Sequence, residues 1–202
     1  MLTLLAALVL HQDPGPGADA NLDASLSALR KDFNAAGGRP RLLILTSPTC
    51  PRCLEGIDVV QGEVLKRSKG KPLAVFVVWM RVLGGDRPEE VRFARQRIAD
   101  KRAKHYWDDA AWAGRAYKKV VSVPKDRDTA MDSFLLYSSK ARWEKSPPRP
   151  AFWMHQWARD GRWLDGPRML AQIEKLLAPS LIRRPHNDAS KERNCLGFQP
   201  PK

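Results

Sequence analysis

Two cysteines, Cys50 and Cys53, lie two residues apart in the stretch TSPTCPRCLEG (residues 46–56), where a run of apolar residues stops. The thiolate is the form of cysteine that attacks a disulfide, and the unpaired N–H groups and dipole at a helix start favour it. Proline suits the first helical position because its missing N–H costs nothing there. We therefore expect Cys50 to begin a helix, with Pro51 as its first residue and Cys53 one turn inside.

These positions predict a division of labour between the two thiols. Arg52 adds a positive charge beside Cys50, so we expect Pro51 and Arg52 to help lower the pKa of Cys50 and make it the nucleophile. Cys53, held further from solvent, is then the resolving thiol that closes the disulfide.

Two other uses of the cysteine pair stay open. A disulfide between residues this close closes a very short loop and gives little entropic stabilisation, so redox chemistry is favoured over a structural bridge. A structural zinc site needs four ligands, and the only other cysteine is Cys195 near the end of the chain. A copper site would combine Cys50 and Cys53 with His155, beside Met154. The favoured interpretation has no metal and no cofactor, and the copper set is its alternative.

The elements around the pair predict a β-α-β unit. Residues 41–47 and 73–82 are continuous apolar runs rich in β-branched and aromatic residues, which is typical of strands buried on both faces. The segment between them carries one apolar helical face: Cys53, Ile57, Val60 and Val64. We expect the two strands to be parallel, with a right-handed crossover through this helix.

The remaining pattern completes one α/β domain over residues 21–178, followed by a poorly ordered basic tail over residues 179–202. The further expected elements are a helix over 22–33, a helix after the turn at 84–88, an extended piece at 104–107, a helix at 111–120, strands at 133–138 and 151–157, and a helix at 169–177.

In this order of elements, with Cys50-Pro51-Arg52-Cys53 after the first buried strand, residues 22–178 resemble the thioredoxin superfamily, and most closely its exported TlpA and ResA type. The resemblance implies a central mixed sheet flanked by helices, with an inserted helix and short strand before the fourth-strand region. It also implies a thiol–disulfide oxidoreductase that exchanges disulfides with protein partners and with an upstream thiol redox partner. A non-catalytic thioredoxin-like binding module stays open as an alternative.

The chain departs from the thioredoxin pattern at the residues around the motif. Thr49 precedes the first cysteine where thioredoxins have tryptophan, and Ile44 stands where they place a buried aspartate. Met131 takes the place of the family's cis-proline, since Pro124 lies several residues too early. The resemblance therefore implies a substrate groove formed with Thr49 and Met131, and a poor general disulfide reductant.

Charge and the N-terminus bear on partners and location. The chain has 35 Lys and Arg against 22 Asp and Glu, but these charges are interleaved, so we expect a basic solvated surface and no specific nucleic-acid partner. The apolar run Leu2 to Leu10, followed by small residues at 18–20, predicts a signal peptide over residues 1–20, although no Lys or Arg precedes the run. The run is too short to span a membrane, which takes about 20 residues. We expect an exported, periplasmic or extracytoplasmic monomer, or a cytoplasmic one if the signal is not real.

Overall fold

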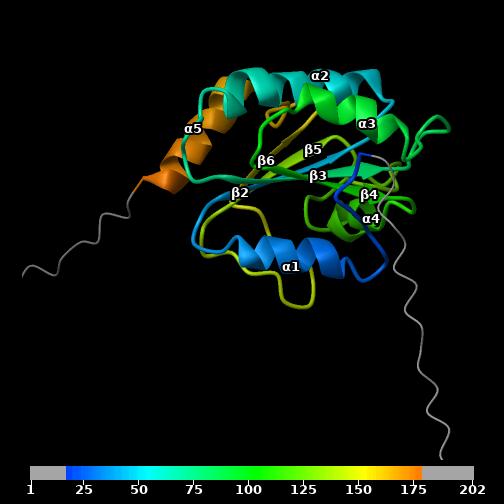
Figure 1. Cartoon of the computed structure of the whole chain (residues 1–202), viewed down its shortest axis with the longest axis horizontal. Helices are drawn as coiled ribbons and strands as arrows, with labels where there is room; N and C mark the ends of the chain where they lie inside the picture. Colours follow the sequence, from blue (N-terminus) through cyan, green and yellow to red (C-terminus); the bar gives the residue numbers. More distant parts are fainter. Residues whose placement is uncertain (1–16, 179–202) are drawn as a thin grey trace, which may run out of the picture.

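The computed structural model describes residues 17–178, and a six-stranded mixed sheet forms its centre (Figure 1). The strands are β1 (Ala20–Asn21), β2 (Arg41–Thr46), β3 (Ala74–Met80), β4 (Ala103–Asp108), β5 (Ser133–Tyr137) and β6 (Phe152–His155), in the spatial order β1-β4-β3-β2-β5-β6. The first four of these in space are mutually parallel, whereas β5 pairs antiparallel with both β2 and β6.

Helices cover both faces of the sheet. They are α1 (Ser27–Ala35), α2 (Pro51–Val59) continued by the π-helical segment η1 (Val60–Leu65), α3 (Glu90–Ala94) continued by the 3-10 turn η2 (Arg95–Arg97), α4 (Trp112–Lys118) and α5 (Gly166–Leu177). Figure 1 shows α2, α3 and α5 on one face of the sheet, with α1 and α4 on the other. The molecule therefore has a hydrophobic core on each side of the sheet.

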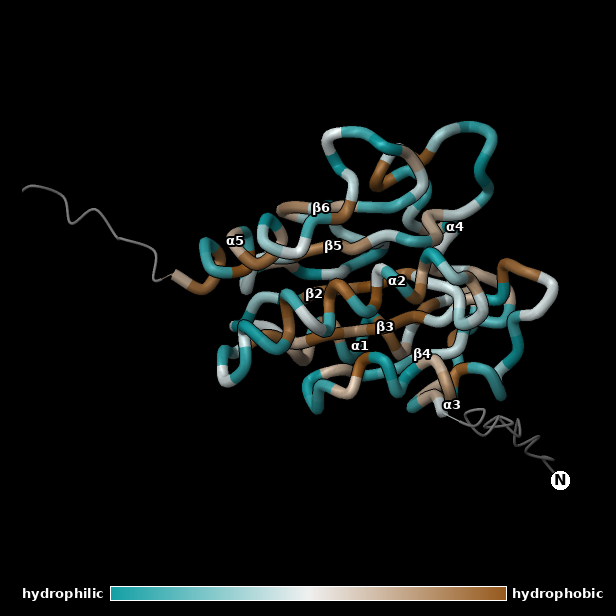
Figure 2. The backbone as a smooth tube through the Cα atoms, turned by 90° about the horizontal axis from the view of Figure 1, so that it is seen from above, coloured by the Kyte–Doolittle hydropathy of each residue, from teal (hydrophilic) through white to brown (hydrophobic). Residues whose placement is uncertain are grey.

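Side chains that alternate along each strand pack into these two cores in turn. In β3, Phe76 and Val78 pack into the core under α1 and α4, whereas Val75 and Val77 pack into the core under α2 and α5. Every residue of β2 and β3 is buried, which explains why both strands are continuous apolar runs in the sequence. Figure 2 shows hydrophobic colour along the central strands and mostly hydrophilic colour in the outer loops.

The predicted thioredoxin-like α/β fold is confirmed. The unit β2-α2-β3 is a parallel β-α-β unit, and β5, β6 and α5 complete the arrangement. The expected inserted helix and strand are also present, as α3 and β4, which lie between β3 and α4. The extended piece expected at 104–107 is the full strand β4, which pairs with β3 from Ala103 to Asp108.

The N-terminal part of the domain differs from the expectation. The first helix begins at Ser27 rather than at residue 22, because Leu26 has a left-handed backbone conformation and the Asp23 side chain accepts hydrogen bonds from Ser25. The residues before this turn form β1 at the edge of the sheet, where Ala20 pairs with Tyr106. A two-residue strand has no periodicity that the sequence could reveal.

The end of the predicted signal peptide contacts the domain. The backbone N–H of Asp19 donates to His105 O at 2.8 Å, and Asp19 Oδ2 accepts from His105 N at 2.7 Å. The rest of the predicted signal peptide (residues 1–16), the predicted tail (179–202) and Cys195 lie outside the described residues. Within residues 17–178, none of the helices has the length and apolar content needed to cross a membrane.

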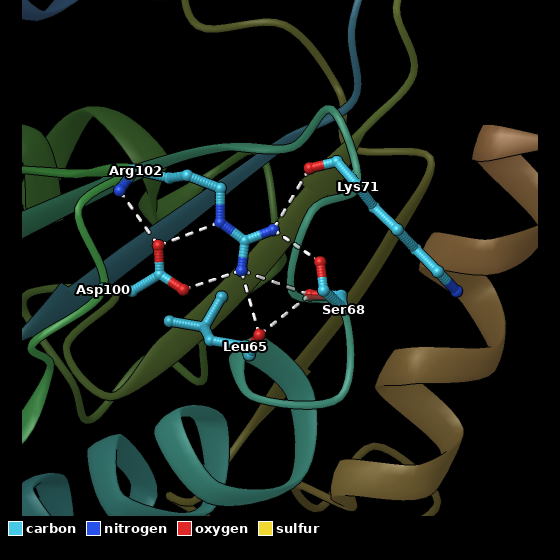
Figure 3. Close-up of polar contacts among 5 residues, drawn as sticks. All are labelled: Leu65, Ser68, Lys71, Asp100 and Arg102. Carbon is cyan, nitrogen blue, oxygen red and sulfur yellow. Dashed lines mark hydrogen bonds and ion pairs between the residues drawn. The ribbon is translucent and has the colours of Figure 1, made fainter.

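A half-buried arginine, Arg102, closes the end of the α2-η1 helix (Figure 3). The Arg102 guanidinium donates to the carbonyl oxygen of Leu65 (2.9 Å), where η1 ends, and to those of Ser68 (2.8 Å) and Lys71 (3.2 Å) in the turns that follow. Asp100 neutralises it through two bonds of 2.7 and 2.8 Å. This cluster fixes the helix that carries the two cysteines.

Candidate active site

Cys50 and Cys53 lie at the start of α2, beyond the carboxyl end of β2. Cys50 is the N-cap residue of α2 and Pro51 is its first residue. The backbone N–H of Cys53 donates to Cys50 Sγ at 3.3 Å, so the sulfur takes the capping role that an oxygen usually has. Cys50 is half-buried, whereas Cys53 is completely buried, and both are free thiols.

This placement shifts the pKa values of the two thiols in opposite directions. The side-chain hydrogen bond from Cys53, with the backbone N–H groups of Cys53 and Arg52, lowers the pKa of Cys50 to about 6, against the effects of burial and the charge of Asp86. The same hydrogen bond, burial and the charge of Asp132 raise the pKa of Cys53. Near neutral pH, Cys50 is therefore the thiolate and Cys53 the thiol.

A buried carboxylate, Asp86, holds the loop that leads to Cys50. Its Oδ1 accepts from the hydroxyls of Ser47 (2.7 Å) and Thr49 (2.6 Å). Its Oδ2 accepts from the backbone N–H groups of Val82 (2.9 Å) and Leu83 (2.7 Å), just after β3. Asp86 thus ties together the loops that follow β2 and β3.

A second buried carboxylate, Asp132, lies on the other side of the cysteines. It immediately precedes β5, in a left-handed backbone conformation (φ 63°), and is only 4% exposed. Burial and the charge of Cys50 raise the pKa of Asp132 to about 7, while Arg52 and Arg127 act in the opposite direction. The surrounding acceptors assign the Gln156 side-chain nitrogen to face Asp132 Oδ1 (3.1 Å) and Arg52 O (3.2 Å).

Gly56 allows this approach between α2 and the end of β6. A Cβ at this position would overlap the Gln156 carboxamide and lie 2.7 Å from Phe134 Cζ. The absence of a side chain on α2 therefore lets Gln156 pack against the helix behind the two cysteines.

A cavity of about 370 Å³ opens beside Cys50. Its walls come from the start of α2, from the segment before β5 and from the end of β6: Cys50, Pro51, Arg52, Arg127, Met131, Asp132, Gln156 and Trp157. The Arg52 guanidinium donates to Gln156 O at 3.3 Å, so this side chain spans from α2 to the opposite wall. Arg52 lowers the pKa of Cys50 through its backbone N–H and not, as expected from the sequence, through the charge of its guanidinium.

The two expected groove residues lie on different sides of Cys50. Met131 lines the cavity together with Cys50. Thr49 is bonded to Asp86 instead, on the side of the loop after β3. Ile44 is a core residue under α2, and the buried carboxylates of the site come from Asp86 and Asp132.

The copper alternative draws no support from the position of His155. His155 Nε2 lies 3.3 Å from Asp160 Oδ1, and its ring stacks on Trp157 with 4.0 Å between centroids. Met154 packs into the core under α2 and α5, so the two potential ligands belong to opposite faces of β6. Among residues 17–178 there is no group of three or more His, Cys, Asp or Glu side chains placed to hold a metal ion.

The site residues that the sequence analysis missed share one edge of the sheet. Asp86 follows the carboxyl end of β3, and Asp132 precedes the antiparallel strand β5, whose Ser133 pairs with Leu45 of β2. Gln156 follows β6, and its backbone N–H donates to Asp132 O at 3.2 Å. Sheet topology was the available signal, because all these segments end at the edge where Cys50 lies.

Comparisons with known proteins add weak similarities. No protein-family model and no curated protein sequence matches the chain. Among solved structures, a secreted disulfide oxidoreductase of Mycobacterium tuberculosis, homologous to E. coli DsbE, is 12% identical with a TM-score of 0.43, over 70% of this chain and 84% of that one. A thioredoxin-like protein in its oxidized form is 14% identical with a TM-score of 0.45, over 70% and 80% of the two chains. A putative electron transfer protein from Aquifex aeolicus is 13% identical with a TM-score of 0.46, over 72% and 85%.

Similarities this weak carry no argument about activity. The function of this chain is inferred from its own residues, above all from the two thiols and the carboxylates around them.

Proposed function

We propose that this protein is a thiol–disulfide oxidoreductase that uses Cys50 and Cys53 to exchange disulfides with protein partners. One observation carries the proposal: the thiol beside the cavity has a lowered pKa, and the buried thiol one turn along the same helix has a raised one. A binding module or a structural pair has no need of this asymmetry.

The first step is attack by the Cys50 thiolate on a sulfur of the partner's disulfide. A new bond forms between Cys50 Sγ and that sulfur, the partner's disulfide breaks, and its second sulfur leaves as a thiolate. The hydrogen bond from the Cys53 side chain and the backbone N–H groups at the start of α2, the helix that Pro51 begins, keep Cys50 in the reactive form.

The second step is resolution by Cys53. Cys53 loses its proton and attacks Cys50 Sγ, so that a Cys50–Cys53 disulfide forms and the partner leaves with its second thiol. Because the pKa of Cys53 is raised, this step needs a proton acceptor. Asp132 suits that role, since it is buried, its charge acts on Cys53, and burial raises its pKa above that of an ordinary aspartate, which makes it a better proton acceptor. The same steps in reverse oxidise a partner, so the geometry fits either direction.

We also propose that the protein is exported and works where disulfides form readily, with an upstream thiol partner that restores its redox state. The apolar run Leu2 to Leu10 supports export. Because Gly17 and Asp19 hydrogen-bond to Arg95 and His105, cleavage N-terminal to Gly17 would leave these contacts intact. N-terminal sequencing of the protein recovered from an extracytoplasmic fraction tests this proposal.

Trapping of the mixed disulfide tests the division of labour between the cysteines. In a Cys195→Ser background, Cys53→Ser should accumulate covalent complexes with disulfide-containing proteins that disappear on addition of a reductant. Cys50→Ser should trap almost none, because the remaining thiol is buried and protonated. Equal trapping by the two variants would contradict the assignment of Cys50 as nucleophile.

A further inference from the structure

The cavity beside Cys50 has a cationic wall. Arg127 donates to Trp157 O at 3.4 Å, as Arg52 does to Gln156 O, so both guanidinium groups are bonded to neutral carbonyl oxygens. Met131 and Trp157 give the cavity apolar surface beside these charges. An occupant next to Cys50 therefore meets apolar side chains and two fixed positive charges.

The cationic surface continues along β6 and the loop that follows it. Three more arginines stack on aromatic rings there: Arg159 over Trp163 (4.1 Å), Arg162 over Trp153 (4.4 Å) and Arg168 over Phe152 (5.4 Å). Arg52 also lies over the Trp163 ring, at 5.9 Å, which links this surface to the cavity. Stacking holds a planar guanidinium in place. Arg162 and Arg168 also each donate from one nitrogen to a carbonyl oxygen, of Trp153 (3.3 Å) and Gly161 (2.6 Å), which leaves their other N–H groups to bind a carboxylate.

Nearby acidic side chains are used within the fold. Asp160 Oδ1 accepts from Arg162 N at 2.7 Å and lies beside His155. Asp165 caps α5 by accepting from Arg168 N at 2.7 Å. Within the described part of the chain, residues 17–178, none of the five arginines of this surface forms an ion pair with a carboxylate.

Two further acids act on the cavity electrostatically. Asp132 interacts with the charges of Arg52 and Arg127, but burial holds its pKa at about 7, so it is only partly ionised near neutral pH. Glu55 on α2 raises the pKa of Asp132 through its charge. With Asp160 and Asp165 counted as well, five arginines stand against four carboxylates, so the surface has an excess of positive charge.

We propose that the cationic surface formed by Arg52, Arg127, Arg159, Arg162 and Arg168 selects partner segments that carry acidic side chains beside the reactive cysteine. The inference rests on the proposed function, since it names the substrate class of the same site. Guanidinium groups bind carboxylates with two parallel hydrogen bonds, and charges at the rim of a site act mainly on the rate of association. The partner segment lies across the cavity, its cysteine at Cys50 and its acidic residues toward Arg127 and Arg162.

Peptide disulfides that differ only in charge test this preference. Three peptides contain one cysteine flanked on both sides by Glu, by Gln or by Lys, each joined as a disulfide to 5-thio-2-nitrobenzoate. Attack by Cys50 on the peptide sulfur releases the coloured thiolate, whose absorbance gives the second-order rate constant. We expect the Glu peptide to react about tenfold faster than the Gln peptide at low salt and the Lys peptide to react more slowly, with the differences shrinking as salt screens the charges.

Variants locate the preference on the surface. Arg127→Gln and Arg162→Gln should each reduce the ratio of the Glu rate to the Gln rate by about threefold. The matched control is Lys31→Gln on α1, which removes one positive charge from a helix on the opposite face of the sheet from α2 (Figure 1) and should leave the ratio unchanged. An equal loss in the control would assign the preference to net charge and overturn the proposal.

The outcomes separate this inference from the proposed function. Equal rates for the three peptides would overturn the acidic preference while leaving disulfide exchange intact. Failure of the wild-type protein to react with any of the three peptides would overturn the proposed function itself.

Discussion

Replacing Asp132 by Asn removes the proposed proton acceptor while keeping the local backbone. Asp132 has a positive φ of 63°, and Asn is among the few residues that tolerate this conformation, so the exchange does not strain the turn before β5. The amide also keeps an oxygen that can accept from Gln156. The substitution therefore changes charge and basicity more than shape.

The structure gives the direction and size of the effect. General-base catalysis by a positioned side chain contributes about 10²- to 10⁴-fold in rate. The charge of Asp132 is also one of the causes that raise the pKa of Cys53, so its removal makes Cys53 easier to ionise and offsets part of the loss. We expect closure of the Cys50–Cys53 disulfide to slow by about 10- to 100-fold near pH 7.

Release of a coloured thiol from Cys50 measures the closure step alone. In a Cys195→Ser background, the mixed disulfide of Cys50 with 5-thio-2-nitrobenzoate is formed at acidic pH and then transferred to higher pH, where attack by Cys53 releases the chromophore. In the protein that keeps Asp132, the first-order rate should rise with pH and level off once Asp132 is ionised. This occurs below about 7, because Cys50 in the mixed disulfide no longer carries the charge that helps to raise the pKa of Asp132. In Asp132→Asn this inflection should be absent.

A stability measurement separates this role from a structural one. Because the folded-state pKa of Asp132 is raised from 3.8 to about 7, the wild-type protein loses stability as pH rises between these values, and the loss is complete above the folded-state pKa. Asp132→Asn should escape that loss, so its free energy of unfolding above pH 7 should not be lower than that of the wild type. A variant that keeps both the wild-type closure rate and its inflection would refute the role of Asp132.

Three further substitutions probe the thiolate and its supports. The rate of alkylation of Cys50 should rise with pH through an inflection near 6 and then level off. Cys53→Ala should move this inflection to higher pH, because it removes the hydrogen bond that is the largest cause of the lowered pKa of Cys50. An unmoved inflection would contradict that cause. Gly56→Ala should displace Gln156 and lower the free energy of unfolding, measured by denaturant titration, by about 1–3 kcal/mol. An unchanged free energy of unfolding would mean that α2 and β6 can separate freely. Asp86→Ala should cost about 2–4 kcal/mol in the same titration, because it leaves buried donors unpaired, and a loss within error would contradict its role in holding the loop before Cys50.

The central part of the fold could be predicted from the sequence because a strand that is buried on both faces appears there as a continuous run of apolar residues. Residues 41–47 and 73–82 are β2 and β3 to within two residues at either end, and the apolar face between them is the α2-η1 helix. The edge elements were harder to predict. β1 has two residues, and α3 has only five before it tightens into a 3-10 turn.

The candidate site could be predicted only where its residues are neighbours in the chain. The cysteine spacing after a strand points to Cys50 and Cys53. Asp86 falls in the predicted turn at 84–88, and Asp132 falls just before the predicted strand at 133–138, so neither is marked as a site residue. Their roles depend on burial and on which loops meet at one edge of the sheet, and neither property is recorded in local sequence. The expected charge effect of Arg52 on Cys50 illustrates the same limit, because its guanidinium bonds to Gln156, more than a hundred positions along the chain.

The most direct test of the account is a redox titration of the Cys195→Ser protein in glutathione buffers of graded potential, read by mass spectrometry of the acid-quenched protein. We predict a reversible two-electron transition in which the reduced form has two free thiols and the oxidised form has a single disulfide joining Cys50 and Cys53. Equilibration from either direction should give the same midpoint. A pair that stays reduced across the accessible range, or that collects glutathione on Cys50 without closing the disulfide, would contradict the claim that these two cysteines form a redox centre.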